Sequence, residues 1–389
     1  MKVLFVGISL KVGGIERALL DQVNDLAARG YQVDLFLFSH TGAYIKDLDS
    51  RVNLLPEGEI IKYTGLTHQE SKKSLSSYFI RNLLAVIARI KGSRWLFLRL
   101  FRYEKKLGDY DIAVSYFNDN GIKSLYYGCN LFVQEMVQAK RKLAWIHSDY
   151  IMSGLNTPEI NAMYELFDGI VNVSKTMKLK FDALRIVPKG NSYCVYNILE
   201  KGRILGNDKA LELTLIKKLK IVTVGRLENN KGTMELLQLA NNLKIQGCEF
   251  KWFFIGQGVL FAKASRYIKD KGLTDYVVLL GQQSNPYSII QSCDLYVSGS
   301  KCETFGISIL EALVLSVPVV AYRYDAIGEV LSGGNGIVCD SYEDLQSEIV
   351  NLIESEDAYL KIKKNAALLF DYKKLNRLQF DNMIENLKK

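Results

Sequence analysis

The feature that most limits how this chain can fold is a repeated alternation of short apolar runs with segments of helical periodicity. KVLFVGI at 2–8 is a continuous apolar run, typical of a strand buried on both faces. Apolar residues then recur at helical spacing up to Leu26, Gly30 ends that helix, and YQVDLFLFS at 31–39 is the next strand. A strand, a helix and a second strand in this order predict a parallel sheet.

The same alternation continues along the chain. Further strands are predicted at 109–117, 142–147, 167–174, 219–227, 251–258, 276–281, 294–300 and 317–322, with 194–200 as a last edge element or the exit to a linker. The fold class predicted is α/β, with two facing, doubly wound, Rossmann-like domains and a cleft between them. We expect domains at 1–200 and 201–370, followed by a C-terminal helix at 371–389 that packs back on the first domain.

The amino-acid composition indicates which class of protein this chain belongs to. A hydrophobic fraction of 48% and a charged fraction of 24% are ordinary for a soluble globular chain. The 6 cysteines form no CxxC pair and there are only 3 histidines, so we expect reduced thiols, no metal site and no cofactor. Since no apolar run approaches the ~20 residues of a membrane span, we expect a cytoplasmic protein.

Positive charge is concentrated in segment 72–106, which holds ten Lys and Arg residues against one acid, Glu104. This excess is larger than the net charge of +8, so the rest of the chain is nearly neutral. The aromatic residues among these bases are Trp95, Phe97 and Phe101, and three bases predicted on one helical face are Arg99, Arg102 and Lys106. Basic helices of this kind bind anionic membranes, so we expect a peripheral protein; the alternative is two helices with a solvated basic side. No nucleic-acid motif accompanies the segment, and we expect no nucleic-acid partner.

Two carboxylates bracket a predicted helix start in KCETFGISILEA at 301–312. If the helix begins at Phe305 or Gly306, Glu303 lies in the loop at the end of a strand and Glu311 lies in the second helical turn. The backbone amides of Phe305, Gly306 and Ile307 would then be available to an anion. Carboxylate, amides and carboxylate in this order suit a sugar, a diphosphate and a ribose. The alternative is a helix that carries two surface glutamates.

Two cations are predicted at the same edge of the second sheet. In GRLENNKG, Arg226 follows the first strand of the second domain and Lys231 lies in the loop that opens the next helix. Both should face the same carboxyl-end edge as Glu303. Two fixed cations there can neutralise a diphosphate leaving group without a metal ion.

These segments resemble a known enzyme family. GRLENNKG, SGSKCETFGISILEALVLSVPVVA and SGGNGIVCD are similar to the nucleotide-sugar domain of family-4 retaining glycosyltransferases, which have the two-domain GT-B fold. VGGIER resembles the glycine-rich loop of that family and AWIHSDY its acceptor-side histidine segment. Two positions depart from the pattern: Thr304 stands at a small, glycine-like position, and Ser316 stands where glycine is common. Neither departure removes a charged group. Because Thr304 would narrow the sugar pocket, the identity of the donor sugar is not predicted.

The resemblance implies that domain 1–200 binds the acceptor and domain 201–370 binds the nucleotide sugar, and it implies roles for matching residues. The catalytic residues it implies are Arg226, Lys231, Glu303 and His147, and the substrate-binding residues are Gly13, Gly14, Gly225, Leu280, Gly281, Thr304, Phe305, Gly306, Ile307 and Glu311. Glu303 would face the donor sugar and Glu311 the ribose, while Arg226 and Lys231 would hold the diphosphate. Backbone amides at the two N-terminal glycines would reach the phosphate, the backbone at 280–281 would border the base, and the histidine would lie near the transferred sugar. A histidine beside a tryptophan is also commonly just a packed residue.

The predicted function is metal-independent, retaining transfer of a hexose from a nucleotide-diphosphate sugar, expected to be a UDP-sugar, to a lipid-linked or glycan acceptor. The basic segment suggests an acceptor at the cytoplasmic face of a membrane, as in capsule, exopolysaccharide or lipopolysaccharide assembly. Two alternatives stay open: a nucleotide-sugar 2-epimerase of the same fold, and a non-catalytic subunit that binds sugar or lipid. An NAD-dependent enzyme is disfavoured because no GxGxxG follows the first strand.

Overall fold

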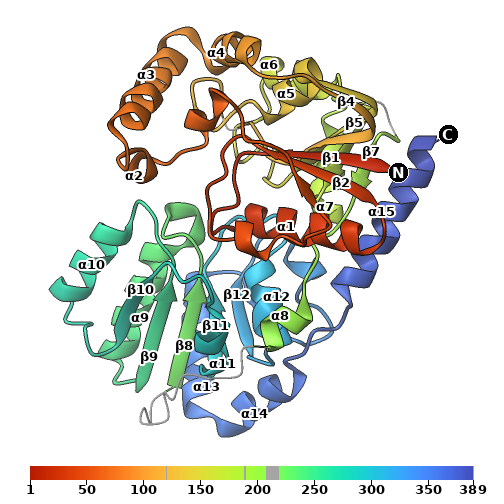
Figure 1. The fold of residues 1–389 in the computed structure, drawn as a ribbon. Coiled ribbons are helices and arrows are strands. Elements are labelled where there is room, and N and C mark those ends of the chain that lie inside the picture. Colours follow the sequence, from red (N-terminus) through yellow and green to blue (C-terminus); the bar gives the residue numbers. More distant parts are fainter. Residues whose placement is uncertain (120, 188–189, 207–218, 389) are drawn as a thin grey trace. The chain divides into compact units, whose positions relative to one another are not determined.

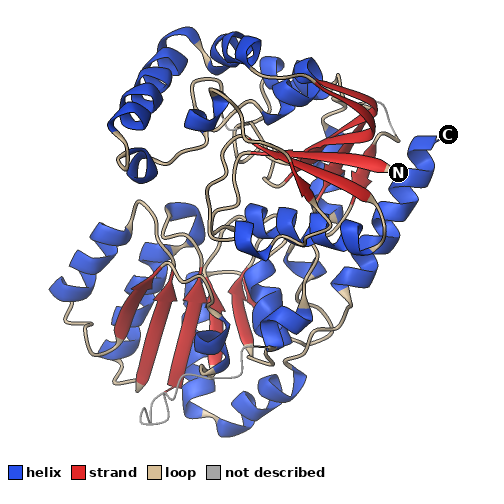
Figure 2. Cartoon of the chain, in the orientation of Figure 1, coloured by secondary structure: helices blue, strands red, loops and turns tan. Residues whose placement is uncertain are grey.

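The computed structural model describes residues 1–119, 121–187, 190–206 and 219–388. The described chain divides into two compact units (Figure 1). Unit 1 comprises Met1–Ile198 and Lys374–Lys389, and unit 2 comprises Leu199–Lys373. Each unit is built on a parallel sheet (Figure 2), as the alternation of apolar runs and helical segments predicts.

The sheet of unit 1 has seven strands within the described residues, all paired in parallel. Its strands are β1 (Lys2–Gly7), β2 (Gln32–Leu37), β3 (Asn53–Leu54), β4 (Leu107–Ser115), β5 (Val137–Ile146), β6 (Gly169–Asn172) and β7 (Ser192–Cys194). Their order in the sheet is β3-β2-β1-β4-β5-β6-β7. The chain adds β2 and β3 on one side of β1 and then returns to add β4 on the other side. The strand order therefore reverses between β1 and β4.

Helices connect the strands of unit 1. They are α1 (Gly14–Ala28), α2 (His68–Ser71), α3 (Leu75–Lys91), α4 (Ser93–Leu100), α5 (Cys129–Met136), α6 (Pro158–Tyr164) and α7 (Lys175–Ala183), with short 3-10 turns at Ile45–Asp47, Ile61–Thr64 and Phe101–Tyr103. Gly30 follows α1 with φ 85° and its amide donates to the Ala27 carbonyl at 3.1 Å, so it ends the helix as predicted.

The C-terminal helix α15 (Tyr372–Lys388) joins unit 1 from Lys374 onward. The Arg377 guanidinium donates to both carboxylate oxygens of Asp25 in α1, with Nε at 3.0 and 3.1 Å. Asn376 Nδ2 donates to Gln22 Oε1 at 2.8 Å and to the Tyr196 carbonyl at 2.6 Å. Because Asp25 and Asn376 are buried, these bonds fasten the helix to α1 and to the segment after β7.

Unit 2 repeats the same design with six strands in its described part. These are β8 (Leu219–Val224), β9 (Phe250–Ile255), β10 (Val277–Gly281), β11 (Leu295–Ser298), β12 (Val319–Tyr322) and β13 (Ile337–Cys339), in the sheet order β10-β9-β8-β11-β12-β13. The order reverses between β8 and β11. The helices are α8 (Lys201–Leu205), α9 (Thr233–Ile245), α10 (Phe261–Asp270), α11 (Tyr287–Gln291), α12 (Ile307–Val314), α13 (Tyr342–Glu354) and α14 (Glu356–Asn365), with 3-10 turns at Asn229–Lys231 and Ile327–Glu329. Leu236 of α9, Ile349 of α13 and Trp252 of β9 lie in the buried core.

Two sequence expectations need correction in segment 72–106. The helix α4 ends at Leu100 and a 3-10 turn follows, so Arg99, Arg102 and Lys106 do not share one α-helical face. Phe97 and Phe101 are 0% and 4% exposed, because they pack into the core of unit 1. Packing within unit 1 therefore accounts for these two aromatic side chains, whereas Trp95 stays exposed.

Strand ends also differ from the prediction. β5 begins at Val137, five residues earlier than expected. Its first half pairs with β4 but carries polar residues, so a search for apolar runs did not detect it. β7 ends at Cys194, so most of 194–200 lies outside the sheet. Ser316 adopts φ 55°, the left-handed region that favours glycine. This backbone conformation therefore explains why the similar family commonly has glycine where this chain has Ser316.

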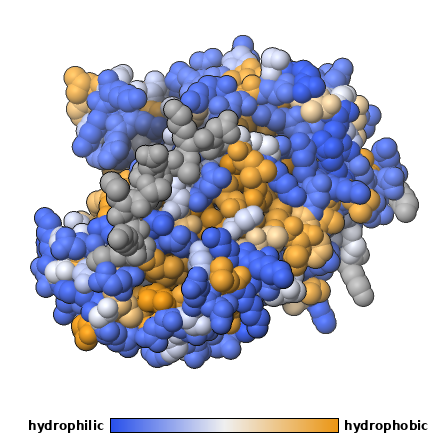
Figure 3. All heavy atoms as spheres, turned by 90° about the horizontal axis from the view of Figure 1, so that it is seen from below, coloured by the Kyte–Doolittle hydropathy of each residue, from blue (hydrophilic) through white to orange (hydrophobic). Residues whose placement is uncertain are grey.

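The surface is largely polar on the face drawn in Figure 3, where hydrophilic side chains surround smaller apolar patches. Within the described residues, no helix is both long enough and apolar enough to cross a membrane.

Candidate active site

The candidate residues of unit 2 gather where its strand order reverses. β8 and β11 are parallel neighbours, so the loops at their carboxyl ends lie side by side. Gly225 and Arg226 follow β8, and Ser300 and Glu303 follow β11. Open α/β sheets bind ligands at this kind of reversal.

Lys231 and Glu303 form an ion pair between these two loops. Ser300 Oγ donates to the same carboxylate oxygen, Oε1 of Glu303, at 3.1 Å. Both charged side chains are mostly covered, with 18% of Lys231 and 21% of Glu303 exposed. Gly232 allows this approach, because it has φ 67° and a Cβ there would lie 2.2 Å from the Gly299 carbonyl oxygen. The loops therefore hold one cation and one carboxylate together at the strand ends.

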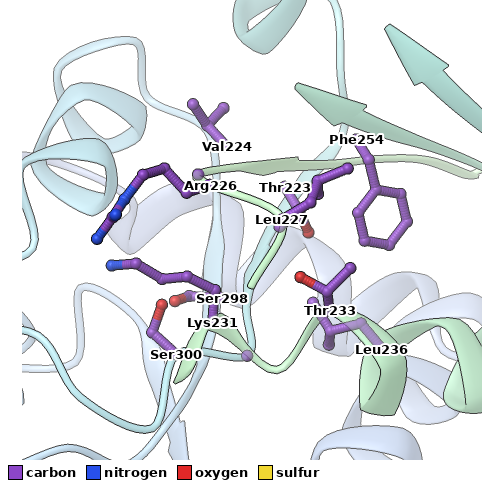
Figure 4. A pocket seen from close by; sticks show the side chains of 12 residues that line it. Thr223, Val224, Arg226, Leu227, Lys231, Thr233, Leu236, Phe254, Ser298 and Ser300 are labelled. Carbon is purple, nitrogen blue, oxygen red and sulfur yellow. The ribbon is translucent and has the colours of Figure 1, made fainter. Parts of the chain in front are cut away.

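Arg226 supplies a second cation at the same edge. Its Nη1 donates to Glu228 Oε1 at 2.9 Å, and 69% of its side chain is exposed. Figure 4 shows the side chains of Arg226 and Lys231 running alongside each other, with their terminal nitrogens at the same end. The sequence placed both cations at this edge together with Glu303, and the structure brings all three there.

A small cavity lies beside these residues. It is lined by Thr223, Val224, Gly225, Arg226, Leu227, Lys231, Thr233, Leu236, Phe254, Ser298, Gly299 and Ser300. Its volume of about 10 Å³ has room for one water molecule. The Thr223 hydroxyl is already used, since it donates to the Val297 carbonyl at 2.7 Å. A sugar nucleotide would therefore bind outside this cavity, at the charged side chains that border it.

The helix α12 begins at Ile307, one or two residues later than the sequence predicted. Gly306 precedes it with φ 84°, and a Cβ there would meet the Tyr324 hydroxyl at 2.3 Å. Phe305 is 2% exposed and its ring packs edge-on against Tyr372, so its side chain belongs to the core and could present only its backbone to a ligand. Thr304 is half-buried in the loop before it.

Glu311 lies in the second turn of α12 and is buried, with 8% exposed. The Tyr287 hydroxyl donates to Glu311 Oε1 at 2.9 Å, and Arg203 Nη1 donates to the Tyr287 oxygen at 2.8 Å. This chain of hydrogen bonds joins α8, α11 and α12. It fixes the carboxylate and was missed by sequence reasoning, because Arg203 and Tyr287 lie in helices far from Glu311 in sequence.

Leu280 and Gly281 end β10, on the far side of β9 from the ion pair. Gln283 Nε2 donates to the Leu280 carbonyl at 2.8 Å, and the Gly256 amide donates to the Gly281 carbonyl at 2.8 Å. Both carbonyls already accept a hydrogen bond within unit 2. A base that used either carbonyl would have to share it or displace the present donor.

Gly13, Gly14 and His147 lie in unit 1. Gly14 opens α1, and a Cβ there would meet nothing within 4 Å, whereas one at Gly13 would lie 2.2 Å from Glu16 Oε2. His147 follows β5, where its amide donates to Asn118 Oδ1 at 2.8 Å. Its ring packs on Tyr116, with centroids 4.5 Å apart. Burial lowers the pKa of His147 to about 3, so the imidazole is neutral at pH 7.

Metal-ligating residues are not clustered in the part of the chain that the structure describes: it contains no group of three or more His, Cys, Asp or Glu that could hold an ion. The positive charge next to Glu303 comes from side chains. These positively charged side chains can bind a phosphate directly.

Comparison with known proteins finds similar sequences and similar folds. The family model of glycosyl transferases group 1 matches residues 211–368, which lie in unit 2 and include Arg226, Lys231, Glu303 and Glu311. Poly(glycerol-phosphate) alpha-glucosyltransferase of Bacillus subtilis is 32% identical over 46% of this chain and 27% of its own length. The N-acetylgalactosamine-N,N'-diacetylbacillosaminyl-diphospho-undecaprenol 4-alpha-N-acetylgalactosaminyltransferase of Campylobacter jejuni is 27% identical over 58% of this chain and 67% of its own length. The chain thus spans between a quarter and two thirds of the length of these relatives.

The whole chain also resembles solved structures. Anabaena HepE in complex with UDP-glucose superposes with a TM-score of 0.65 at 18% identity, over 99% of this chain and 100% of that one. At this identity the likeness establishes the fold. The chain therefore has the GT-B glycosyltransferase fold, and its residues 211–368 carry the sequence pattern of group 1 glycosyl transferases.

Proposed function

We propose that this protein is a retaining, family-4 glycosyltransferase that moves a hexose from a UDP-sugar to a hydroxyl group of a lipid-linked or polysaccharide acceptor. The observation that carries the proposal is the Lys231–Glu303 ion pair at the strand reversal of unit 2, with Arg226 beside it. The activities of the Bacillus and Campylobacter relatives support transfer to phosphate-containing acceptors, and HepE, of the same fold, is solved with UDP-glucose.

The proposed chemistry follows from the charges. The bond between sugar C1 and the phosphate oxygen breaks, and a bond from C1 to the acceptor oxygen forms on the same face. Negative charge develops on the departing diphosphate, where Lys231 and Arg226 stabilise it. The leaving phosphate oxygen takes the proton of the acceptor hydroxyl. Glu303 holds Lys231 in place and offers its other oxygen to donor sugar hydroxyls, and no metal ion is required.

Glu311 is assigned to the ribose hydroxyls in this proposal. Its carboxylate is held by Tyr287, which is held in turn by Arg203. A carboxylate has about four acceptor positions, so Glu311 can accept from Tyr287 and from a ligand hydroxyl together. His147, as a neutral imidazole, would exchange hydrogen bonds with the transferred sugar without adding charge.

The helix α3 supports binding to a membrane surface. Its most exposed apolar side chains recur at helical spacing along one face: Leu75, Phe79, Leu83, Val86 and Ile90, which are 79%, 68%, 60%, 49% and 70% exposed. We call this face the α3 stripe. Arg89 and Lys91 lie near its end. Exposed apolar residues beside bases fit an anionic lipid surface, which we propose is the cytoplasmic leaflet.

The direct test is a transfer assay. UDP-, GDP- and ADP-sugars are first screened for thermal stabilisation of the protein, and the donor that stabilises most is then tested with prenyl-diphosphate sugars and with glycerol-phosphate polymers as acceptors. We expect a UDP-sugar to stabilise, transfer with retained anomeric configuration and an unchanged rate in EDTA. Conversion of the donor without acceptor into an epimer, or loss of the rate in EDTA, would contradict the proposal.

A further inference from the structure

Unit 1 contains a cavity that the proposed chemistry does not use. Its volume is about 480 Å³, within the range of small-molecule sites. Ile8 and Ser9, which follow β1, line one part of it, and residues 123–126, which follow β4, line another. The cavity therefore lies at the strand reversal of unit 1, the position at which a doubly wound sheet receives a ligand.

The lining of this cavity is strongly basic, with the cations Lys11, Arg81, Arg89 and Lys123. The charge of Lys11 is compensated by Glu70, whose Oε2 lies 2.8 Å from Lys11 Nζ. The same Nζ donates to the Gly65 carbonyl at 2.6 Å. Arg81 uses its Nε to donate to the Leu66 carbonyl at 2.9 Å.

The other two cations of the cavity have no compensating charge. Among the described residues, Arg89 and Lys123 have no carboxylate within ion-pair distance, and both are exposed. Glu16 is the one acid in the lining. Even with Glu70 counted against Lys11, the cavity keeps an excess of positive charge, which an anionic ligand would neutralise.

The helix α3 joins this cavity to the α3 stripe. Arg81, Ala85 and Arg89 recur every fourth residue and line the cavity. At about 100° per residue, this face is turned roughly 120° from the centre of the α3 stripe. One helix thus presents a cationic wall to the cavity and an exposed apolar face to its surroundings. A ligand that joins a phosphate to a lipid would engage both faces.

We propose that this cavity binds the phosphate or diphosphate group of an anionic acceptor, with Arg89 and Lys123 as the principal cations. Both have hydrogen-bond donors that can reach phosphate oxygens, and Arg89 can do so with two donors at once. The proposal specifies the acceptor class of the transfer reaction and in that respect rests on the proposed function. Binding is nevertheless measurable without turnover.

The test is titration calorimetry with UDP present at saturation, so that the site in unit 2 is occupied. The probes are farnesyl diphosphate, inorganic pyrophosphate, glycerol 3-phosphate and the uncharged farnesol. We expect farnesyl diphosphate to bind, its affinity to fall with added salt, and Arg89→Gln with Lys123→Gln to weaken it by about tenfold or more. The matched control is Lys46→Gln with Arg185→Gln, which removes one lysine and one arginine of unit 1 that are also exposed and lie outside the cavity.

The outcomes separate the two proposals and the two sources of phosphate. Binding of farnesyl diphosphate alone supports a lipid-linked acceptor, and equal binding of pyrophosphate or glycerol 3-phosphate supports recognition of the phosphate itself. Equal weakening by both variant pairs, binding of farnesol as tight as that of the diphosphate, or binding of farnesyl diphosphate that is lost when UDP is present would overturn the assignment. If no sugar is transferred but the cavity variants still lose binding selectively, this site stands and the transferase proposal fails.

Discussion

The two units place charge differently at the same position in the same kind of sheet. Both sheets are parallel and reverse their strand order once, at β1 and β4 in unit 1 and at β8 and β11 in unit 2. In unit 2 the cations there are paired with carboxylates, Lys231 with Glu303 and Arg226 with Glu228. In unit 1 the cavity is larger, and Arg89 and Lys123 have no such partners in the described chain.

In our proposals, topology fixes where a ligand binds, while side chains decide which ligand. A paired lysine is held in one position, which suits stabilisation of charge that develops at a defined atom during reaction. Unpaired cations in a wide cavity suit binding of an anion whose charge does not change. We therefore propose that unit 2 carries the reaction and that unit 1 binds the acceptor.

The largest effect is expected from Lys231→Ala. Removing this cation takes away stabilisation of the leaving diphosphate, so turnover should fall by roughly 10²-fold or more, as for lost oxyanion donors. Steady-state kinetics with the UDP-sugar measures the effect. Lys301→Ala is the control, because Lys301 lies in the loop after β11, pairs with Glu235 of α9 and is not a proposed ligand. Nearly normal turnover of the Lys231 variant would show that the reaction does not take place at this site.

The next effect concerns the α3 stripe of unit 1. Phe79→Ser with Leu83→Ser should weaken binding to phosphatidylglycerol vesicles by about tenfold or more, because burial of each large apolar side chain contributes roughly 1.5–3 kcal/mol. Vesicle flotation measures the bound fraction. Ile245→Ser with Leu360→Ser removes two exposed apolar side chains of unit 2 and should leave binding unchanged. Equal loss of vesicle binding in both variant pairs would show that the α3 stripe is not a specific membrane-binding surface.

A smaller effect is expected from Tyr287→Phe in unit 2. The change deletes the hydroxyl that donates to Glu311 and accepts from Arg203, so the carboxylate is less well fixed. The KM for the donor should rise about tenfold while kcat changes little, since a hydrogen bond to a charged group contributes about 1.5–3 kcal/mol and only part of this reaches the ligand through Glu311. Tyr267→Phe, in α10, serves as the matched control. A fall in kcat with KM unchanged would instead connect Tyr287 to the chemical step.

The last effect concerns stability and not activity: a pH dependence of the stability of unit 1. Burial lowers the pKa of His147 to about 3, so its contribution is present above its ordinary pKa of about 6.5 and is lost as pH falls toward 3. Burial raises the pKa of Asp119 to about 7, so its contribution is present below about 3.9 and is lost as pH rises through 7. The two slopes oppose each other between about pH 4 and 6.5.

Urea unfolding at a series of pH values separates these groups. His147→Asn should lose less stability than the wild type when pH falls from 6.5 to 4.5, and Asp119→Asn should lose less when pH rises from 5 to 8. Parallel pH profiles for the wild type and both variants would show that burial of these groups does not control the stability of unit 1.

Sequence reasoning predicted the fold well because buried parallel strands are continuous apolar runs, such as that of β1, and because glycines such as Gly30 mark helix ends. It also placed Arg226, Lys231 and Glu303 at one sheet edge, since parallel strands end at the same edge. It could not find Ser300, Tyr287 or Arg203 as partners, because these contacts depend on how helices pack. Nor could it separate the buried faces of α4 from the exposed face of α3, since both are amphipathic.

The most direct test of the central claim is a crossed titration of two variants with two ligands. Lys231→Ala and the pair Arg89→Gln with Lys123→Gln are each titrated with the UDP-sugar and with farnesyl diphosphate. We predict that Lys231→Ala weakens only the UDP-sugar and that the cavity pair weakens only farnesyl diphosphate. If either variant weakens both ligands equally, the two strand reversals do not bind different substrates and the account is wrong.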